Sequence, residues 1–411
     1  MIQKPELLAP AGNLEKLKIA VLYGADAVYI GGEAFSLRTA ADNFSLADIR
    51  EGVSFAHRMD AKVYLALNVF LRNGDIENVK QYLAEVCRTG IDAVIVSDLG
   101  MFMLVREIAP TMEIHVSTQA NTTNYISAQT WYKMGAKRVV LARELSIEEI
   151  SEVSKKVPVG LELEMFVHGA MCVSYSGRCL LSNYMINRDS NKGNCAQPCR
   201  WKYNLVEEKR PGEYMPVYEN DRGTFIFNSK DLCLIRHIPE ILAAGVTSLK
   251  IEGRVKSEYY VASVVKAYRE ALDSYISSPE HYRYDPRLYE ELCKVSHRDY
   301  WEGFYFGKSE TDGQIYGTSS YIREYDIVGI VTSYDEMTGI TCVEQRNRFF
   351  RGDEVEIISP LVPGYTTHTV EFLQDENGFD INSAPHAAMK LKMNFGRRVA
   401  VNSIIRKKSG K

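Results

Sequence analysis

The sequence predicts an α/β protein: a (β/α)8 barrel of the TIM type with a cysteine-rich insertion, followed by a small C-terminal all-β, barrel-like domain. Three observations support this prediction. Strand-like and helix-like segments alternate about eight times before residue 260. This alternation is interrupted at about residues 170–222, where four cysteines cluster. From residue 321 onward, short alternating runs separated by turn residues replace the helical patterns.

A glycine repeat marks the junctions between helices and strands. Gly24, Gly90, Gly135 and Gly245 each end an amphipathic helical pattern and precede a short apolar run by two or three residues. Glycine suits the position after a helix because it adopts a left-handed backbone without the steric cost of a Cβ atom. A short run that is apolar on both faces is typical of a buried parallel strand.

Eight segments are candidates for the barrel strands. In chain order they are residues 6–12, 27–32, 62–70, 93–98, 113–120, 138–144, 159–169 and 247–254. Helical patterns such as 75–90 and 147–157 lie between them. An open doubly wound sheet is the alternative, but no G-x-G-x-x-G motif follows the first strand, which weakens a dinucleotide-binding version of that fold. In a barrel, we expect the active site at the carboxyl ends of the strands.

The chain divides into two predicted domains. The barrel should occupy residues 1–310, with the insertion at about 170–222, and the β domain residues 321–411. Three basic stretches of the β domain could contact RNA, and two of them interleave phenylalanine with Lys or Arg. A solvated surface over core aromatic residues is the alternative. The stretches are residues 346–351, 390–398 and 406–411.

Composition limits the class of protein. The chain has 411 residues, 25% of them charged, and a net charge of −4, which excludes a uniformly basic nucleic-acid coat but not a local basic patch. The first residues contain no apolar segment of the signal-peptide kind. No apolar stretch approaches the ~20 residues that span a membrane. We therefore expect a cytoplasmic protein without membrane association, whose thiols stay reduced.

Four cysteines lie within one short segment. Cys172 and Cys179 form a C-x6-C pair, and Cys195 and Cys199 form a C-x3-C pair. In the cytosol, clustered cysteines more often bind metal or perform redox chemistry than form disulfides. Structural zinc usually has closer pairs in both halves, while a [4Fe–4S] cluster requires four converging thiolates. Spacing alone leaves open a cluster, a zinc site or four unconnected buried thiols.

Polar side chains occur near the ends of several predicted strands. A barrel interior filled by apolar side chains would not need them, so they predict a polar mouth above the core. Ion pairs that orient one another are the alternative. Strict alternation places Glu162, Glu164, Phe166 and His168 on one face. The candidate catalytic residues are His115, Gln119, Glu162, His168 and Glu252.

Several motifs carry a family resemblance. The segments EMFVHGAMCVSYSGRCLLSNY, GNCAQPCRW, FNSKDL, SLKIEGR and VSHRDYWEGF resemble the signature of the collagenase-like peptidase family U32. The resemblance covers essentially the whole chain. The most similar branch is the prephenate-dependent tRNA hydroxylases, which form 5-hydroxyuridine at the wobble position of the anticodon. This resemblance implies that Cys172, Cys179, Cys195 and Cys199 hold a [4Fe–4S] cluster.

The resemblance also implies substrates and partners. These are the anticodon loop of tRNA, prephenate as co-substrate, and in some families a related partner chain. Prephenate is a dicarboxylate, and the Arg fork matches a carboxylate. We therefore expect Arg143, Lys250 and Arg254 to bind it, with His115 and Gln119 as neutral donors. A hydroxylase of rRNA or of another aromatic substrate remains an alternative.

The family name suggests peptidase activity, which the residues support little. The chain has no H-E-x-x-H and no G-x-S-x-G motif. A cysteine peptidase needs a thiolate paired with a base, and His168 lies four residues before Cys172. A peptidase with a Cys–His dyad is therefore a second hypothesis.

Overall fold

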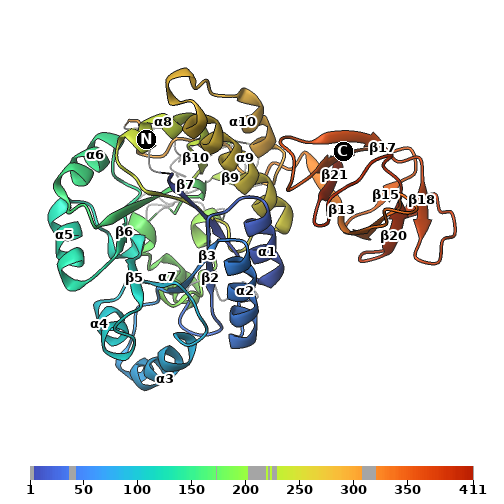
Figure 1. The fold of residues 1–411 in the computed structure, drawn as a ribbon. Helices are drawn as coiled ribbons and strands as arrows, with labels where there is room; N and C mark the ends of the chain where they lie inside the picture. Colours follow the sequence, from blue (N-terminus) through green and yellow to red (C-terminus); the bar gives the residue numbers. More distant parts are fainter. Residues whose placement is uncertain are drawn as a thin grey trace, which may run out of the picture.

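The computed structural model describes residues 4–36, 43–172, 174–201, 219–220, 223–224, 229–307 and 321–410. Eight parallel strands close into a barrel surrounded by helices (Figure 1). The ring runs from β1 through β7 to β11, which pairs with both β7 and β1. The strands are β1 Glu6–Pro10, β2 Ala27–Gly31, β3 Lys62–Leu67, β4 Ala93–Val96, β5 Glu113–Val116, β6 Arg138–Val140, β7 Glu162–Ala170 and β11 Ser248–Ile251. Each overlaps a predicted segment, so the predicted barrel is confirmed.

A helix follows each barrel strand, and polar residues fix where most of these helices begin. Asn13, Ser45, Asp98, Asn124 and Ser146 each accept a hydrogen bond from a backbone N–H in the first helical turn. The four repeat glycines have φ between 88° and 106°, as predicted for residues that end helices. The helices are α1 Leu14–Leu22, α2 Leu46–Arg58, α3 Ile76–Val86, α4 Leu99–Ile108, α5 Tyr125–Met134, α6 Ile147–Lys156, α8 Ile238–Ala243 and α9 Glu258–Ser277.

The predicted insertion follows β7. Its described part contains α7 (Leu181–Ile186) and three short 3₁₀ turns at Tyr175–Gly177, Ser190–Lys192 and Pro198–Arg200. The chain then returns through β10 (Asp231–Cys233), which pairs antiparallel with the end of β7 outside the ring. β12 (Tyr300–Trp301) pairs with β10. The sequence did not predict this extension of the sheet.

One predicted face of β7 is wrong. In the register of β7 with β11, Phe166 is paired with Lys250 and His168 with Ile251. Val167 therefore has no partner residue in β11 and forms a bulge. Such a bulge shifts the alternation by one residue. Phe166 therefore lines the barrel mouth. The His168 ring instead lies outside the barrel, with its centroid 5.5 Å from that of Tyr268 on α9.

The C-terminal domain is a seven-stranded antiparallel sheet with its own core. The strand order is β17-β16-β21-β13-β14-β20-β18, and β15 and β19 form a separate pair. Val328, Val343, Val355 and Leu391 are among the buried residues of this core. The strands are β13 Tyr325–Tyr334, β14 Thr341–Gln345, β15 Phe349–Phe350, β16 Glu354–Ile358, β17 Thr366–Thr369, β18 Leu373–Asp375, β19 Ser383–Ala384, β20 Lys390–Met393 and β21 Ile404–Lys408.

A buried arginine joins the two domains. Arg406 on β21 is fully buried and contacts the carboxylates of Glu291 at 2.7 Å and Glu356 at 2.5 Å. Glu291 lies on α10 (Pro286–Cys293), a helix of the barrel domain. Arg346 similarly pairs with Glu15 on α1 at 2.7 Å. These two arginines therefore help to hold the domains together, while the RNA contact expected of the basic stretches stays a prediction.

Within the described part of the chain, no helix is long and apolar enough to cross a membrane.

Candidate functional site

A cavity of about 240 Å³ lies at the carboxyl ends of the barrel strands. We call it the mouth cavity. Its wall includes side chains from the strand ends, the loops that follow them, and the insertion. It brings together all four clustered cysteines and five further predicted site residues. These are Cys172, Cys179, Cys195, Cys199, Gln119, Arg143, Lys250, Glu252 and Arg254.

The insertion places the cysteines at this cavity. Cys172 follows the end of β7, and the other three come from the 3₁₀ turns and loops around α7. Each of the four is half-buried, and none forms a disulfide. The backbone N–H of Leu181 donates to Cys179 Sγ at 3.3 Å, and that of Gln197 donates to Cys195 Sγ at 3.3 Å. These two hydrogen bonds fix the positions of the sulfur atoms, and metals bind cysteine as the thiolate.

Polar contacts fasten the insertion to the barrel. The amide and hydroxyl of Ser176 donate to the Glu144 carboxylate at 2.6 and 2.5 Å. Arg178 Nε donates to the Gln119 carbonyl at 2.8 Å. Inside the insertion, the Ser190 hydroxyl donates to the Cys179 carbonyl at 2.5 Å. The thiols are thus held by a connected framework, which a metal centre requires of its supporting residues.

The four cysteines of the insertion line one cavity and are the candidate ligands for a metal centre. Among the residues that the structure describes, no three His, Cys, Asp or Glu side chains are grouped closely enough to hold a single metal ion. The four thiols are instead distributed around the wall of one cavity. In a [4Fe–4S] cluster each thiolate binds a different iron, so separated thiolates around a common space suit it. Cys172, Cys179, Cys195 and Cys199 are the residues that could hold such a cluster.

Three buried cations face the same cavity. Lys250 Nζ lies 2.7 Å from Glu164 Oε1 and 4.5 Å from the centroid of the Tyr29 ring. Arg143 donates to the Ala170 carbonyl at 3.3 Å. Arg254 Nη1 donates to the Ser36 hydroxyl at 2.7 Å. Burial in a low-dielectric wall strengthens the attraction of these cations for an anion.

Two glycines create the space that Arg254 occupies. A Cβ atom on Gly31 would lie 1.9 Å from Arg254 Nη1, and one on Gly12 would lie 2.2 Å from the Arg254 carbonyl oxygen. Real side chains do not approach so closely, so these positions require glycine while the guanidinium stays in place. The two consecutive glycines at positions 31 and 32, at the end of a strand, could have indicated this close approach from the sequence.

The cavity carries an excess of positive charge. Lys256 joins Arg143, Lys250 and Arg254 in its wall and was not among the predicted site residues. Glu252 is the only carboxylate among the described residues that line the cavity. Such a wall suits a small molecule with more than one negative charge.

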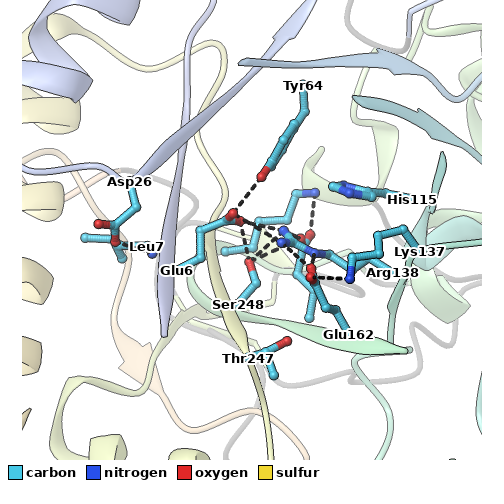
Figure 2. A network of polar contacts seen from close by, with 12 residues as sticks. Glu6, Leu7, Asp26, Tyr64, His115, Lys137, Arg138, Glu162, Thr247 and Ser248 are labelled. Carbon is cyan, nitrogen blue, oxygen red and sulfur yellow. Dashed lines mark hydrogen bonds and ion pairs between the residues drawn. The ribbon is translucent and has the colours of Figure 1, made fainter. Parts of the chain in front are cut away.

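Figure 2 shows a buried network of ion pairs inside the barrel. Lys250, which lines the mouth cavity, belongs to this network. Arg138 pairs with Glu6 at 2.5 Å, Glu162 at 2.6 Å and Glu164 at 3.0 Å. Glu164 in turn holds Lys250. Burial alone would raise the pKa of Glu164, but the Lys250 ammonium and the Arg138 guanidinium outweigh it and lower the pKa to about 2. The network connects the amino ends of the strands to the mouth cavity.

Three candidate catalytic residues do not line the mouth cavity. Glu162 lies at the amino end of β7, where it pairs with Arg138 and Lys137. His115 is buried beneath the cavity, 3.9 Å from Glu113, and burial lowers its pKa. His168 is buried outside the barrel, and burial lowers its pKa to about 3. Alternation along a strand predicts which side chains share a face. It does not predict which end of the strand a residue occupies or where a bulge shifts the alternation.

The fold and the site define a class: a (β/α)8-barrel protein whose mouth combines four thiols with an excess of cations. The chain belongs to peptidase family U32. The model of that family matches residues 12–315, and the model of the U32 C-terminal domain matches residues 323–406.

Two tRNA hydroxylation proteins and a collagenase are among the proteins that this chain resembles along most of its length. The chain is 43% identical to tRNA hydroxylation protein P1 of Bacillus subtilis, over 98% of this chain and 95% of that protein. It is 39% identical to tRNA hydroxylation protein P of Escherichia coli, over 93% of this chain and 92% of that protein. It is also 33% identical to a collagenase of Porphyromonas gingivalis, over 86% of each chain.

Proposed function

We propose that this chain hydroxylates the wobble uridine of tRNA to 5-hydroxyuridine in the cytoplasm, with prephenate as co-substrate and a [4Fe–4S] cluster on the four cysteines. One observation carries the proposal: the thiols and the cations line a single cavity at the barrel mouth. That juxtaposition occurs in a chain that matches tRNA hydroxylation proteins along nearly its whole length.

The cations would orient the co-substrate. Arg143 and Arg254 present planar forks that match a carboxylate bidentately, and Lys250 adds a point charge. The rings of Tyr29 and Phe166, which also line the cavity, would contact the apolar part of the ligand. Glu164 holds Lys250 in position from below. The cavity wall thus combines cations that could bind carboxylates with rings that could contact the apolar part of the ligand.

The reaction needs an oxygen donor, an acceptor for two electrons and a base, and the residues of the site supply a candidate for the base. Replacing the C5–H bond of uridine by C5–OH removes two electrons from the ring. When bound, a [4Fe–4S] cluster supplies one-electron redox chemistry. Glu252 is the candidate to accept a proton, and the Tyr29 hydroxyl lies 3.4 Å from its Oε2 atom. The anticodon loop offers its base unpaired, which reduces the cost of placing it at a recessed site.

The Cys–His dyad of the peptidase hypothesis is not formed. Cys172 lines the mouth cavity. The His168 ring packs outside the barrel against aromatic residues of α9 and β12, with centroids 5.5 Å from Tyr268 and 5.2 Å from Tyr300. With a pKa of about 3, His168 is also a weak base at neutral pH. These contacts favour hydroxylation over a peptidase of this type.

The test combines nucleoside analysis with spectroscopy. Bulk tRNA from deletion cells should lack 5-hydroxyuridine, and a plasmid copy should restore it, whereas Cys179→Ser should not. Cys342→Ser, in a strand of the C-terminal sheet, is the matched control and should restore it fully. Anaerobically purified wild-type protein should contain iron and sulfide and absorb visible light, and Cys179→Ser should lose both.

Prephenate dependence has its own test. Cells that cannot synthesise prephenate should lose the modification even with the wild-type protein present. Unchanged tRNA in the deletion strain would refute the proposal for tRNA, and rRNA nucleosides would then be analysed in the same strains. Colourless, iron-free protein that still restores the modification would refute the cluster alone.

A further inference from the structure

Two further hollows lie beside the mouth cavity along the barrel rim, and neighbouring hollows share lining residues. We propose that the three form one path for single-stranded RNA, in which the nucleotides that flank the target base lie outside the cavity. This inference rests on the proposed function, because it takes tRNA as the substrate. It adds a binding surface that the mouth cavity does not include.

The hollows share lining residues. The middle hollow, of about 170 Å³, is lined by Met171 and Cys172, which also line the mouth cavity. It is lined as well by Trp301, which also lines an outer hollow of about 400 Å³. The series runs from the end of β7 across β12 toward α10. A bound strand could therefore pass from one hollow to the next without leaving the surface.

Aromatic side chains line this path. Tyr175 is 53% exposed and Phe304 is 40% exposed in the middle hollow. The rings of Trp301 and Phe304 lie 5.4 Å apart in an edge-on arrangement. Tyr289 lines the outer hollow. Tyr175 and Phe304 are thus exposed, while Trp301 and Tyr289 are half-buried. Exposed rings can hold unpaired bases, since every base has a π face that can stack.

The charges of the outer hollow suit a phosphate backbone. Lys230 and Arg236 line it, and the Arg236 guanidinium lies 4.4 Å from the centroid of the Tyr289 ring. Its one lining carboxylate, Glu302, lies 2.8 Å from His237 Nε2. A cation beside an aromatic ring can bind a phosphate while the ring stacks on the neighbouring base.

The basic stretches of the C-terminal domain are less suited to this role. Arg346 and Arg406 pair with carboxylates of the barrel domain, and Lys407 pairs with Asp353 at 2.7 Å. These three cations already have carboxylate partners, and the path adjoins the cavity where the target base would react. Continuity with that cavity favours the flanking nucleotides of the same RNA as the occupant, over an unrelated peptide.

The experiment tests whether the Phe304 ring stacks on one particular base of the RNA. The probe is a fluorescein-labelled anticodon stem-loop with uridine at the wobble position, and a series in which each loop nucleotide in turn lacks its base. Binding is measured by fluorescence anisotropy for the full-length wild-type protein and for Phe304→Ala. Stacking predicts that one base removal next to the target weakens wild-type binding about fivefold or more. The same removal should have no further effect on Phe304→Ala, because the stack is already lost.

A second variant tests the backbone contact. Arg236→Gln should weaken binding at low salt and reduce the slope of log affinity against log salt by about 0.7, as expected for one phosphate of a single strand. Phe379→Ala and Lys133→Gln are the matched controls. Phe379 is exposed in the C-terminal domain and Lys133 on α5, and neither lines the path. Circular dichroism confirms that each variant is folded.

The outcomes separate this inference from the proposed function. Suppose that wild-type protein binds the stem-loop and that tRNA hydroxylation in cells requires the protein. If Phe304→Ala and Arg236→Gln then bind the stem-loop as tightly as wild type, the proposed path is wrong and the proposed function stands. If wild-type protein does not bind the stem-loop and the deletion leaves tRNA unchanged, both fail. Binding of a labelled peptide that depends on Phe304 would then assign the hollows to a protein partner.

Discussion

Glu164 should contribute substantially to barrel stability although it lies in no catalytic motif. Its side chain is fully buried, and its carboxylate contacts Lys250 at 2.7 Å and Arg138 at 3.0 Å. We expect Glu164→Gln to keep the shape of the side chain but to leave both cations without this partner. Removing one member of a buried ion pair typically costs about 3–5 kcal/mol.

The pKa of Glu164 gives a second value for the same effect. It is lowered from 4.5 to about 2, despite the burial that opposes this, because Lys250 and Arg138 favour the charged form. A depression of this size corresponds to about 3 kcal/mol of stability at neutral pH. Because the folded pKa is depressed, this contribution is present above pH 4.5 and is lost as the pH falls toward about 2.

Urea unfolding tests this prediction. All three tryptophans, Trp131, Trp201 and Trp301, precede the C-terminal domain, so their fluorescence reports the barrel. Glu164→Gln should lower the free energy of unfolding by about 3 kcal/mol at pH 7, and the difference from wild type should shrink below half by about pH 3. Glu152→Gln, on the exposed face of α6, is the control and should change nothing measurable. A loss below about 1 kcal/mol, or one independent of pH, would refute the reasoning.

Three further predictions concern other parts of the molecule. Gly31→Ala should displace Arg254 and raise the prephenate concentration needed for tRNA hydroxylation about tenfold or more, which is a loss of about 1.4 kcal/mol of binding free energy. Gly74→Ala is the control, because the space around Gly74 is open, and it should leave the prephenate requirement unchanged. Equal activity of the two variants would contradict the placement of Arg254 against Gly31. Arg406→Met should leave Lys294 as the remaining cation beside Glu291 and Glu356 and weaken the contact between the domains by up to about 3 kcal/mol. Scanning calorimetry should then show the C-terminal domain unfolding in a separate transition at lower temperature, and a single unchanged transition would contradict this. His168→Phe should retain tRNA hydroxylation with an unchanged pH profile, since the ring stays uncharged above about pH 3; a lost alkaline or acidic limb would contradict this.

The sequence determined the barrel and the location of its chemistry. Every barrel strand overlaps a predicted segment, because apolar runs between amphipathic helices are a local property that tertiary contacts reinforce. The cysteine insertion was equally visible, since its thiols are close in sequence and its position after β7 brings them to the mouth. Gln119, Arg143, Lys250, Glu252 and Arg254 were found because strand ends meet at the same rim.

Tertiary structure decided the features that depend on one extra residue or on a distant partner. The bulge at Val167 turns His168 out of the barrel, and counting alternate residues cannot detect an inserted one. The pairing of Arg138 with Glu6, 132 residues away, requires the closed ring, as does the pairing of Arg406 with Glu291 between domains. The adjoining hollows at Cys172 and Trp301 likewise arise only when β12 joins the sheet beyond β7. Local patterns therefore predicted the elements, whereas long-range packing determined which polar side chains meet.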